Sequence, residues 1–174
     1  HLAIAVITHG VDFNDWQSAD ADSPEVLERI QKLNPYIISV GALRPRKGYN
    51  LSIRSFAKVK NHFPDLKYVI VGKRHGEHFY EKLKTLIRDL HLESDVFMLE
   101  DVHTRSELAT LYKNAELFCL LSRSIDNDVE AFGLVFLEAA ACNLPVVGTT
   151  EGGVPDAVKN GENGILADVQ DTKL

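Results

Sequence analysis

The sequence predicts a doubly wound α/β domain, with a mostly parallel sheet and helices on both faces. Short apolar runs bounded by Gly, Pro or polar residues, such as residues 36–41 and 67–72, are typical of strands buried on both faces. These runs alternate with segments whose apolar residues recur at helical spacing, and right-handed crossovers between such strands give a Rossmann-like domain. Ligands of this fold bind outside the carboxyl ends of the strands.

Each expected strand is an apolar run that ends at a turn-forming or polar residue. The runs cover residues 2–8, 36–41, 67–72, 95–99, 116–121, 145–148 and 165–166. The stretch at residues 9–12 is expected to be a turn, and residues 14–22 are expected to form a polar loop in which Trp16 is the only large apolar group. No internal repeat or linker divides the chain, so we expect a single domain over residues 1–174.

The expected helices lie between these strands, at residues 24–33, 49–62, 77–90, 105–114, from near 133 onward, and 154–158. Ser23 is a suitable cap for the first of them, with a proline at its first position. In the second we expect Leu51, Phe56 and Val59 to face the core. Ser106 is the expected start of the helix over residues 105–114.

Composition bounds the class of protein. The chain has 174 residues, of which 45 % are hydrophobic and 25 % charged, and its net charge of −6 provides no field that would attract nucleic acid. Cys119 and Cys142 lie in apolar runs, which favours core packing in a reducing, cytoplasmic compartment. No apolar run reaches the roughly 20 residues of a membrane helix. The chain opens on a strand-like stretch and stops as a new segment begins, so we expect a fragment of a longer protein.

A basic cluster stands at the rim where ligands of this fold bind. The loops that follow the strands are residues 41–48, 72–77, 99–104, 122–132 and 149–153. Arg44, Arg46 and Lys47 lie in the first of these loops, before a helix, where cations suit a phosphate or diphosphate. A solvated basic turn is the alternative. The second loop matches neither G-x-G-x-x-G nor a P-loop, which disfavours a dinucleotide site.

Two acids, Glu130 and Glu138, flank a helix start at Gly133. The backbone N–H groups at that start are available to a diphosphate or to sugar hydroxyls. Residues 134–141 are otherwise apolar, which indicates burial, and a buried carboxylate needs partners such as hydroxyl groups. The alternative is that Glu130 is a surface acid and Glu138 faces solvent. A glycosidase-type acid pair, with carboxyls roughly 5 to 10 Å apart, is a further possibility.

Metal sites are disfavoured. The run Asp126-Asn127-Asp128 imitates a D-x-D metal site but lies in a polar loop. His75 and His78 straddle an expected helix start, and no third ligand is evident. We therefore expect no metal ion.

The stretch at residues 130–138, EAFGLVFLE, resembles the E-x7-E motif of the retaining GT-B glycosyltransferases of family GT4, the glycosyl transferases group 1 domain. The resemblance continues through residues 139–147 and 152–155, and back to residues 40–48 and 69–72. Residues 9–12 are similar to the hinge between the two domains of such enzymes. The resemblance implies the C-terminal, donor-binding half of a GT-B fold, with the acceptor-binding N-terminal domain absent and the closing C-terminal helix truncated.

The resemblance also implies a role for each matching residue. Glu130 would contact hydroxyls of the donor sugar near the reacting carbon, and Lys47 would neutralise the departing diphosphate. Glu138 would bind the ribose, and Val102 would lie near the base of a UDP- or GDP-linked donor. The sugar and diphosphate would also touch the backbone amides of Phe132, Gly133 and Leu134. Neither a metal nor another cofactor is needed, because cations and a helix end stabilise the leaving group.

Four features depart from the family pattern, and one of them is Ala131 in place of the first glycine of E-G-F-G. Ala42 replaces the usual arginine of G-R-L, and we expect Arg44, two residues on and on the same side of an extended chain, to take over its contact with the diphosphate. Glu100 replaces a glycine before the base-binding valine, and the loop at residues 122–129 is longer than usual. These changes affect the expected base preference and loop geometry.

The sequence therefore predicts the donor-binding domain of a retaining glycosyltransferase of the hexosyltransferase type, inactive as a fragment. Its partners would be a nucleoside-diphosphate sugar, an unknown acceptor and its own N-terminal domain, and only that missing domain could contact a membrane. The alternatives are a non-catalytic nucleotide-binding module and a GT-B nucleotide-sugar epimerase.

Overall fold

The computed structural model describes residues 9–19 and 24–169, and within them the sheet is parallel and six-stranded in the order β3-β2-β1-β4-β5-β6. The strands are β1 Tyr36–Val40, β2 Lys67–Val71, β3 Val96–Leu99, β4 Leu117–Cys119, β5 Val146–Thr149 and β6 Gly164–Ala167. The doubly wound prediction is confirmed, and the order is that of a Rossmann fold. The strand expected at residues 2–8 lies outside the described residues.

The helices follow the predicted alternation. They are α1 Phe13–Gln17, α2 Pro24–Leu33, α3 Tyr49–Lys60, α4 Glu77–Asp89, α5 Arg105–Asn114, α6 Leu134–Ala141 and α7 Val154–Ala157, with a 3-10 turn, η1, at Pro45–Lys47. The cap expected at Ser23 lies outside the described residues. None of the described helices is long and apolar enough to cross a membrane.

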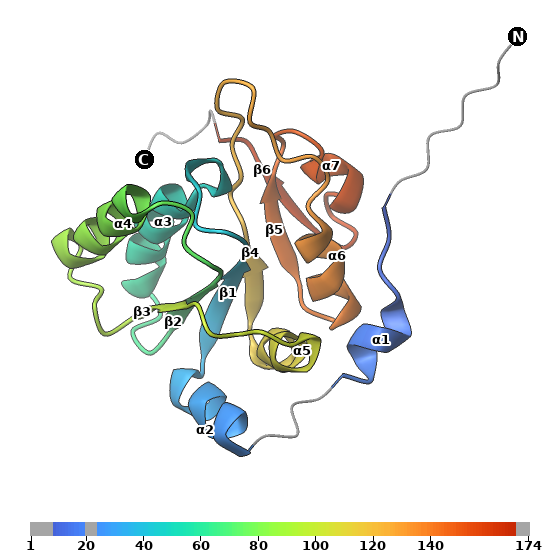
Figure 1. Cartoon of the computed structure of the whole chain (residues 1–174), viewed down its shortest axis with the longest axis horizontal. Helices are drawn as coiled ribbons and strands as arrows, with labels where there is room; N and C mark the ends of the chain where they lie inside the picture. The colour runs from blue at the N-terminus through green and yellow to red at the C-terminus, as the bar shows by residue number, and fades with distance from the viewer. Residues whose placement is uncertain (1–8, 20–23, 170–174) are drawn as a thin grey trace, which may run out of the picture.

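Helices cover both faces of the sheet (Figure 1). Tyr68 and Phe118 pair with successive residues of β1 and therefore point to opposite faces. The Tyr68 ring lies 5.5 Å from that of Phe56 on α3, and the Phe118 ring lies 5.2 Å from that of Phe136 on α6. The core thus has an α3–α4 layer on one face and an α5–α6 layer on the other.

The polar loop expected at residues 14–22 is wrong over its first part, where the structure has α1. The Asp12 carboxylate caps this helix by accepting two backbone N–H groups, and Trp16 is buried with its ring 5.8 Å from that of Tyr112. A polar segment this short has no helical period to detect, because its stability comes from the cap and from one distant aromatic contact.

Two smaller expectations are also wrong. Thr104, rather than Ser106, starts α5: its hydroxyl accepts the Glu107 N–H at 3.1 Å, and its own N–H donates to the Glu107 carboxylate at 2.8 Å. Val59 does not face the core but is 38 % exposed, because it lies on the last turn of α3 at the edge of an open pocket. Phe56 is buried as expected, whereas Leu51 is only partly buried.

The loops that leave β1 and β4 come together at the carboxyl end of the sheet. These neighbouring strands continue in opposite directions, β1 toward β2 and β4 toward β5, which opens the crevice where doubly wound folds bind ligands. Gly48 permits the approach, because a Cβ atom there would lie 1.8 Å from the carbonyl oxygen of Leu121. Its φ of 67° is also one that glycine adopts readily.

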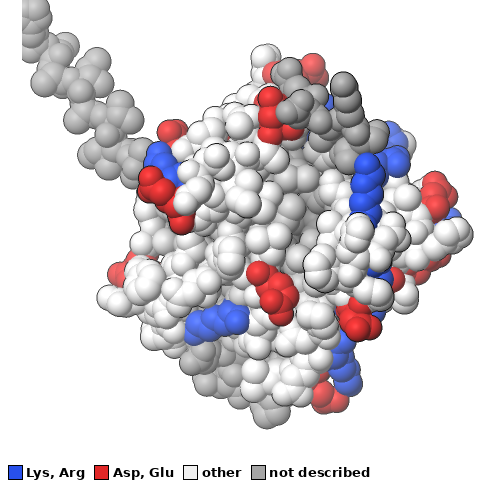
Figure 2. Space-filling model, turned by 180° about the vertical axis from the view of Figure 1, so that it is seen from behind, with Lys and Arg blue, Asp and Glu red and all other residues white. Residues whose placement is uncertain are grey.

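Charged side chains are scattered on the face opposite to the view of Figure 1. Figure 2 shows a broad uncharged area on that face, with an acidic and a basic side chain just below its middle and further acidic and basic side chains around the edge. This distribution offers nucleic acid no continuous basic surface there, in agreement with the net charge of −6.

Candidate functional site

Glu130 lies in the loop between β4 and α6, which rises beside η1 at the top of Figure 1. The backbone carbonyl of Glu130 accepts the Gly153 N–H at 2.8 Å, so the loop after β5 holds the backbone of Glu130 in place. Its side chain is only 8 % exposed. The alternative of a surface loop acid is therefore wrong, and Glu130 is a buried carboxylate that needs partners.

Three donors meet one oxygen of Glu130. Its Oε2 accepts from Lys47 Nζ at 2.6 Å, from Arg46 Nη1 at 2.7 Å and from Ser122 Oγ at 3.3 Å. Its Oε1 has no hydrogen-bond partner among the described residues. The burial of this acid is thus compensated through one oxygen, and the other remains available to a ligand.

Lys47 reaches Glu130 because η1 turns the chain back toward the sheet. Pro45 stands at the first position of this turn, and Gly48 ends it in the left-handed region. The Lys47 side chain is 9 % exposed, so its ammonium group is held in the crevice rather than in open solvent. For Lys47, the alternative of a solvated basic turn is wrong.

Arg44 points elsewhere in the same rim. Its Nη2 lies 3.4 Å from Nδ1 of His75, and the Leu43–Arg74 bridge holds the loops after β1 and β2 side by side. Its Nε is buried without a hydrogen-bond partner among the described residues. Arg44 makes no ion pair with Glu130 among the described residues, and its Nη2 atom faces His75 instead.

Glu138 lies on the second turn of α6 and faces α5. The Tyr112 hydroxyl donates to its Oε2 at 3.4 Å, and the side chain is half-buried. Burial raises the pKa of the Glu138 carboxyl, while the Tyr112 hydroxyl and the charge of Arg105 act in the opposite direction. Glu138 and Glu130 therefore have separate surroundings and share no hydrogen-bond donor among the described residues.

The start of α6 lies between the two acids. Gly133 has a φ of 79° and caps the helix without a side-chain hydrogen bond, so the first N–H groups of α6 lack partners within the helix. A Cβ atom at Gly133 would meet the Phe136 ring at 2.7 Å. The Phe132 ring lies 6.1 Å from that of His9, which places the stretch resembling an interdomain hinge beside this helix start.

Val102 and Glu100 follow β3, at the edge of the sheet. Val102 is partly buried against the core, and Glu100 accepts from Arg74 Nε at 2.8 and 2.9 Å. The acid that replaces the family's glycine is thus paired with a basic residue of the neighbouring loop. Among the described residues, no hydrogen bond joins Val102 to Glu130, Arg46 or Lys47.

Among the described residues, no group of three or more His, Cys, Asp and Glu side chains could hold a metal ion. In the D-x-D run, Asp128 Oδ1 lies 2.9 Å from Arg46 Nε. His75 faces Arg44, and His78 is exposed on the first turn of α4.

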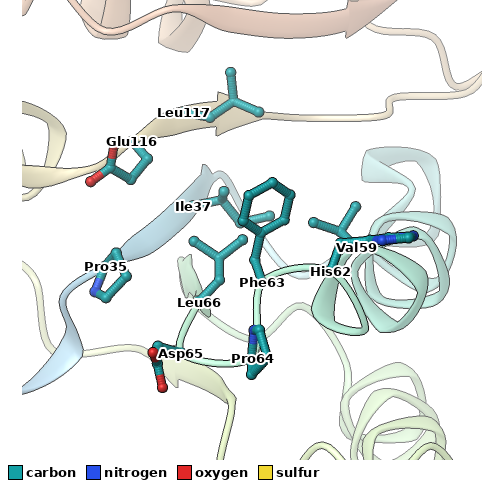
Figure 3. A pocket seen from close by; sticks show the side chains of 10 residues that line it. All are labelled: Pro35, Ile37, Val59, His62, Phe63, Pro64, Asp65, Leu66, Glu116 and Leu117. Atoms are coloured by element: carbon teal, nitrogen blue, oxygen red, sulfur yellow. The ribbon is translucent and has the colours of Figure 1, made fainter.

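An open apolar pocket of about 570 Å³ lies at the opposite end of the sheet, near the amino ends of β1 and β4 (Figure 3). The side chains of Phe63, Val59 and Leu66 line it together with Ile37 and Leu117. None of the residues predicted to bind a ligand contributes to this lining.

A family model described as glycosyl transferases group 1 matches residues 25–173. The chain belongs to this family. It is 32 % identical over 139 residues to the GDP-mannose-dependent alpha-(1-6)-phosphatidylinositol monomannoside mannosyltransferase of Mycolicibacterium smegmatis, which covers 79 % of the chain and 35 % of the relative. It is 34 % identical over 143 residues to the N-acetyl-alpha-D-glucosaminyl L-malate synthase of Bacillus anthracis, which covers 82 % of the chain and 34 % of the relative.

The chain also resembles solved structures of the GT-B fold. HepE from Anabaena, crystallised with UDP and glucose, superposes with a TM-score of 0.76 at 26 % identity, over 94 % of this chain and 43 % of that one. The C-terminal domain of the group 1 protein LpcC from Francisella tularensis shares the fold, with a TM-score of 0.73 at 23 % identity over 91 % and 80 % of the two chains. The chain spans about a third of the length of the curated relatives it matches.

The sequence singles out the two acids and the lysine of the candidate site, but not the residues that contact them. Ser122 and Tyr112 carry no motif, because their roles depend on contacts between distant segments. The sequence identifies Arg46 as a cation next to a helix start but does not predict its ion pairs with Asp128 and Glu130. An excess of acids in the loop at residues 126–130, facing a basic loop, is the signal that could have indicated these pairs.

Proposed function

We propose that this chain binds the donor in a retaining, metal-independent hexosyltransferase, which moves a sugar from UDP or GDP to an acceptor hydroxyl held by another domain. The observation that carries the proposal is the contact of Lys47 with Glu130, a buried cation beside a buried acid, in the crevice between the loops of β1 and β4. Diphosphate and sugar hydroxyl require these two kinds of group next to each other.

Lys47 is proposed to stabilise the diphosphate as it departs. An ammonium group has three N–H donors, and the Glu130 carboxylate occupies one of them, so the others can reach phosphate oxygens. The charge of Arg44, which makes no ion pair with an acid among the described residues, and the N–H groups of the α6 start would add to this stabilisation. These fixed positive groups provide the electrostatic stabilisation that other enzymes obtain from a metal ion.

Glu130 is proposed to orient the transferred sugar through Oε1, near the reacting carbon. Glu138 lies more than one helical turn past Gly133, and it is proposed to accept the ribose hydroxyls. Val102 is proposed to lie beside the base. The different surroundings of the two acids support these separate roles better than a joint acid–base role. The backbone amides of Phe132, Gly133 and Leu134 would lie between them, against the sugar and diphosphate.

The experiment is a calorimetric titration of the chain with UDP, GDP and ADP. We expect one of them to bind in the micromolar to millimolar range, and Glu138→Gln to weaken it about tenfold, the loss of a hydrogen bond to a charged group. Glu81→Gln, which removes an exposed helical acid paired with Lys84, is the matched control and should leave the affinity unchanged. Failure of all three nucleotides to bind would contradict the proposal.

The cytoplasmic location and the acceptor-binding partner domain belong to the same proposal. Because half of the cleft would come from that partner domain, we expect no sugar transfer by this chain alone. Turnover by the isolated chain would contradict the assignment of the acceptor to another domain. An epimerase would instead convert the sugar of its donor, which chromatography of the sugar nucleotide would detect.

A further inference from the structure

Arg46 connects η1 to the loop at residues 122–130 at several points. Its backbone carbonyl accepts the Arg123 N–H at 2.7 Å, at the start of the loop. Its Nε lies 2.9 Å from Asp128 Oδ1, and its Nη1 donates to Glu130 Oε2 at 2.7 Å, at the end of the loop. A single residue of η1 therefore holds both ends of this loop.

The geometry points to a role for Arg46 as the residue that positions Glu130 for the donor sugar; we propose that it fixes the carboxylate so that Oε1 faces the ligand. This inference rests on the proposed function. Arg46 would act through Glu130 and would not itself bind the donor, since its two ion pairs among the described residues are with acids of this chain.

Burial makes the contact with Glu130 the stronger of the two. The side chains of Arg46 and Glu130 are 17 % and 8 % exposed, whereas that of Asp128 is 58 % exposed. An ion pair with an exposed acid is screened by water, while a pair between buried groups is not. Asp128 thus orients the guanidinium group from the solvent-exposed side, and the guanidinium group in turn orients the buried Glu130 carboxylate.

The planar guanidinium group explains why this position holds arginine. Its Nη1 donates a hydrogen bond to Glu130, while its Nε lies 2.9 Å from Asp128 Oδ1 without the geometry of a hydrogen bond. One planar group thus faces two carboxylates at once, which a lysine ammonium group cannot reproduce. Without Arg46, the Glu130 carboxylate would keep Lys47 and Ser122 but could turn about its last bond. Its charge would then compete with the diphosphate for Lys47.

Two effects of Arg46 can be distinguished by mutation: its charge, and its placement of the Glu130 carboxylate. Asp128, the exposed acidic partner of Arg46, can be neutralised together with Arg46 so that the net charge stays the same. Arg46→Gln removes one positive charge, whereas Arg46→Gln combined with Asp128→Asn removes one charge of each sign and keeps the net charge. If Arg46 acted on the ligand through its charge alone, the double variant would recover the lost binding. If it acts by position, the double variant stays impaired.

The nucleotide that binds the wild type is identified first, and its sugar nucleotide is then chosen: UDP-glucose for UDP, GDP-mannose for GDP or ADP-glucose for ADP. Calorimetry measures the affinities of the nucleotide and of its sugar nucleotide for each variant. The expected result is that Arg46→Gln lowers the affinity ratio of sugar nucleotide to nucleotide about tenfold, as Glu130→Gln does, and that the double variant has the same lowered ratio. An unchanged ratio in Arg46→Gln, or its recovery in the double variant, would overturn the positioning role.

Amide hydrogen exchange separates this inference from the proposed function, because it needs no ligand. Peptides that cover residues 123–130 should exchange faster in Arg46→Gln than in the wild type, while peptides from α4 should not change. Unchanged exchange at residues 123–130 would overturn the positioning role alone. A wild-type chain that binds no nucleotide would overturn the proposed function, whatever the exchange shows.

Discussion

Lys47 Nζ lies 2.6 Å from Oε2 of Glu130, with both side chains less than 10 % exposed, at the point where the loops after β1 and β4 meet. The two residues are 83 positions apart in the sequence, so the doubly wound topology alone brings them together. A buried ion pair of this kind is costly to break, because the remaining partner keeps its charge without compensation.

Lys47→Ala is therefore expected to lower the free energy of unfolding by roughly 1–3 kcal/mol, less than a fully unpaired acid would cost, because Arg46 and Ser122 still contact Glu130. Urea denaturation measures the change. Adding Glu130→Gln should recover part of the loss, since it removes the uncompensated charge. If the loss of unfolding free energy in the double variant equals the sum of the losses in the two single variants, the two residues do not interact.

Gly48→Ala is expected to destabilise the domain much more than Gly76→Ala. Both glycines have positive φ, so each substitution incurs roughly 1–3 kcal/mol of backbone strain. Only at Gly48 would the added Cβ atom meet another backbone atom, 1.8 Å from the Leu121 carbonyl oxygen; at Gly76 nothing lies within 4 Å. Thermal unfolding of the two variants checks this, and similar melting temperatures would mean that the loops do not approach so closely.

Asp95→Asn is expected to lower stability at neutral pH and to have less effect in acid. Burial alone would raise the pKa of Asp95, but the ammonium groups of Lys60 and Lys67, at 2.7 and 2.8 Å, outweigh it and hold this pKa below 3.8. A lowered pKa stabilises the native state above the unfolded value, and this stabilisation is lost as the pH falls through the native value. Urea midpoints of variant and wild type should converge below about pH 4. A pH-independent difference would contradict this role.

Nucleotide binding should strengthen as the pH rises, in a way that depends on Glu138. Burial raises the pKa of this carboxyl above 4.5, and the ionised form accepts ribose hydroxyls better than the neutral form. The affinity difference between wild type and Glu138→Gln should therefore widen as the pH rises from 4.5 through the raised pKa. Comparing the two proteins cancels the ionisation of the nucleotide itself. A constant difference, measured by calorimetry across this range, would exclude the carboxylate as the ribose acceptor.

The sheet could be predicted from the sequence because its evidence is local. Each buried strand is a short apolar run, and β1 and β2 match their expected positions to within one residue. The α1 helix could not be predicted, because it depends on Trp16 packing against Tyr112, which is distant in sequence. Val59 was assigned to the core from its spacing, and the structure contradicts this because α3 passes the end of the sheet there.

The candidate site could be predicted only in part. Glu130, Glu138 and Lys47 were identified by the motif they resemble, and their place at the carboxyl end of the sheet followed from the fold class. The hydrogen bond between Lys47 and Glu130 follows from how the loops fold, which no spacing rule describes. Arg46 illustrates this limit, since its contacts depend on the exact path of the loop at residues 122–130.

The central claim is that a nucleoside diphosphate binds with its diphosphate between η1 and the start of α6. Two-dimensional NMR of the isotope-labelled chain with the nucleotide that binds tests it most directly. The account predicts that the backbone amide signals of Lys47, Gly133 and Glu138 move on saturation, while those of Phe63 and Leu66, beside the apolar pocket at the opposite end of the sheet, stay in place. Movement confined to Phe63 and Leu66, or no movement of the Gly133 signal, would contradict it.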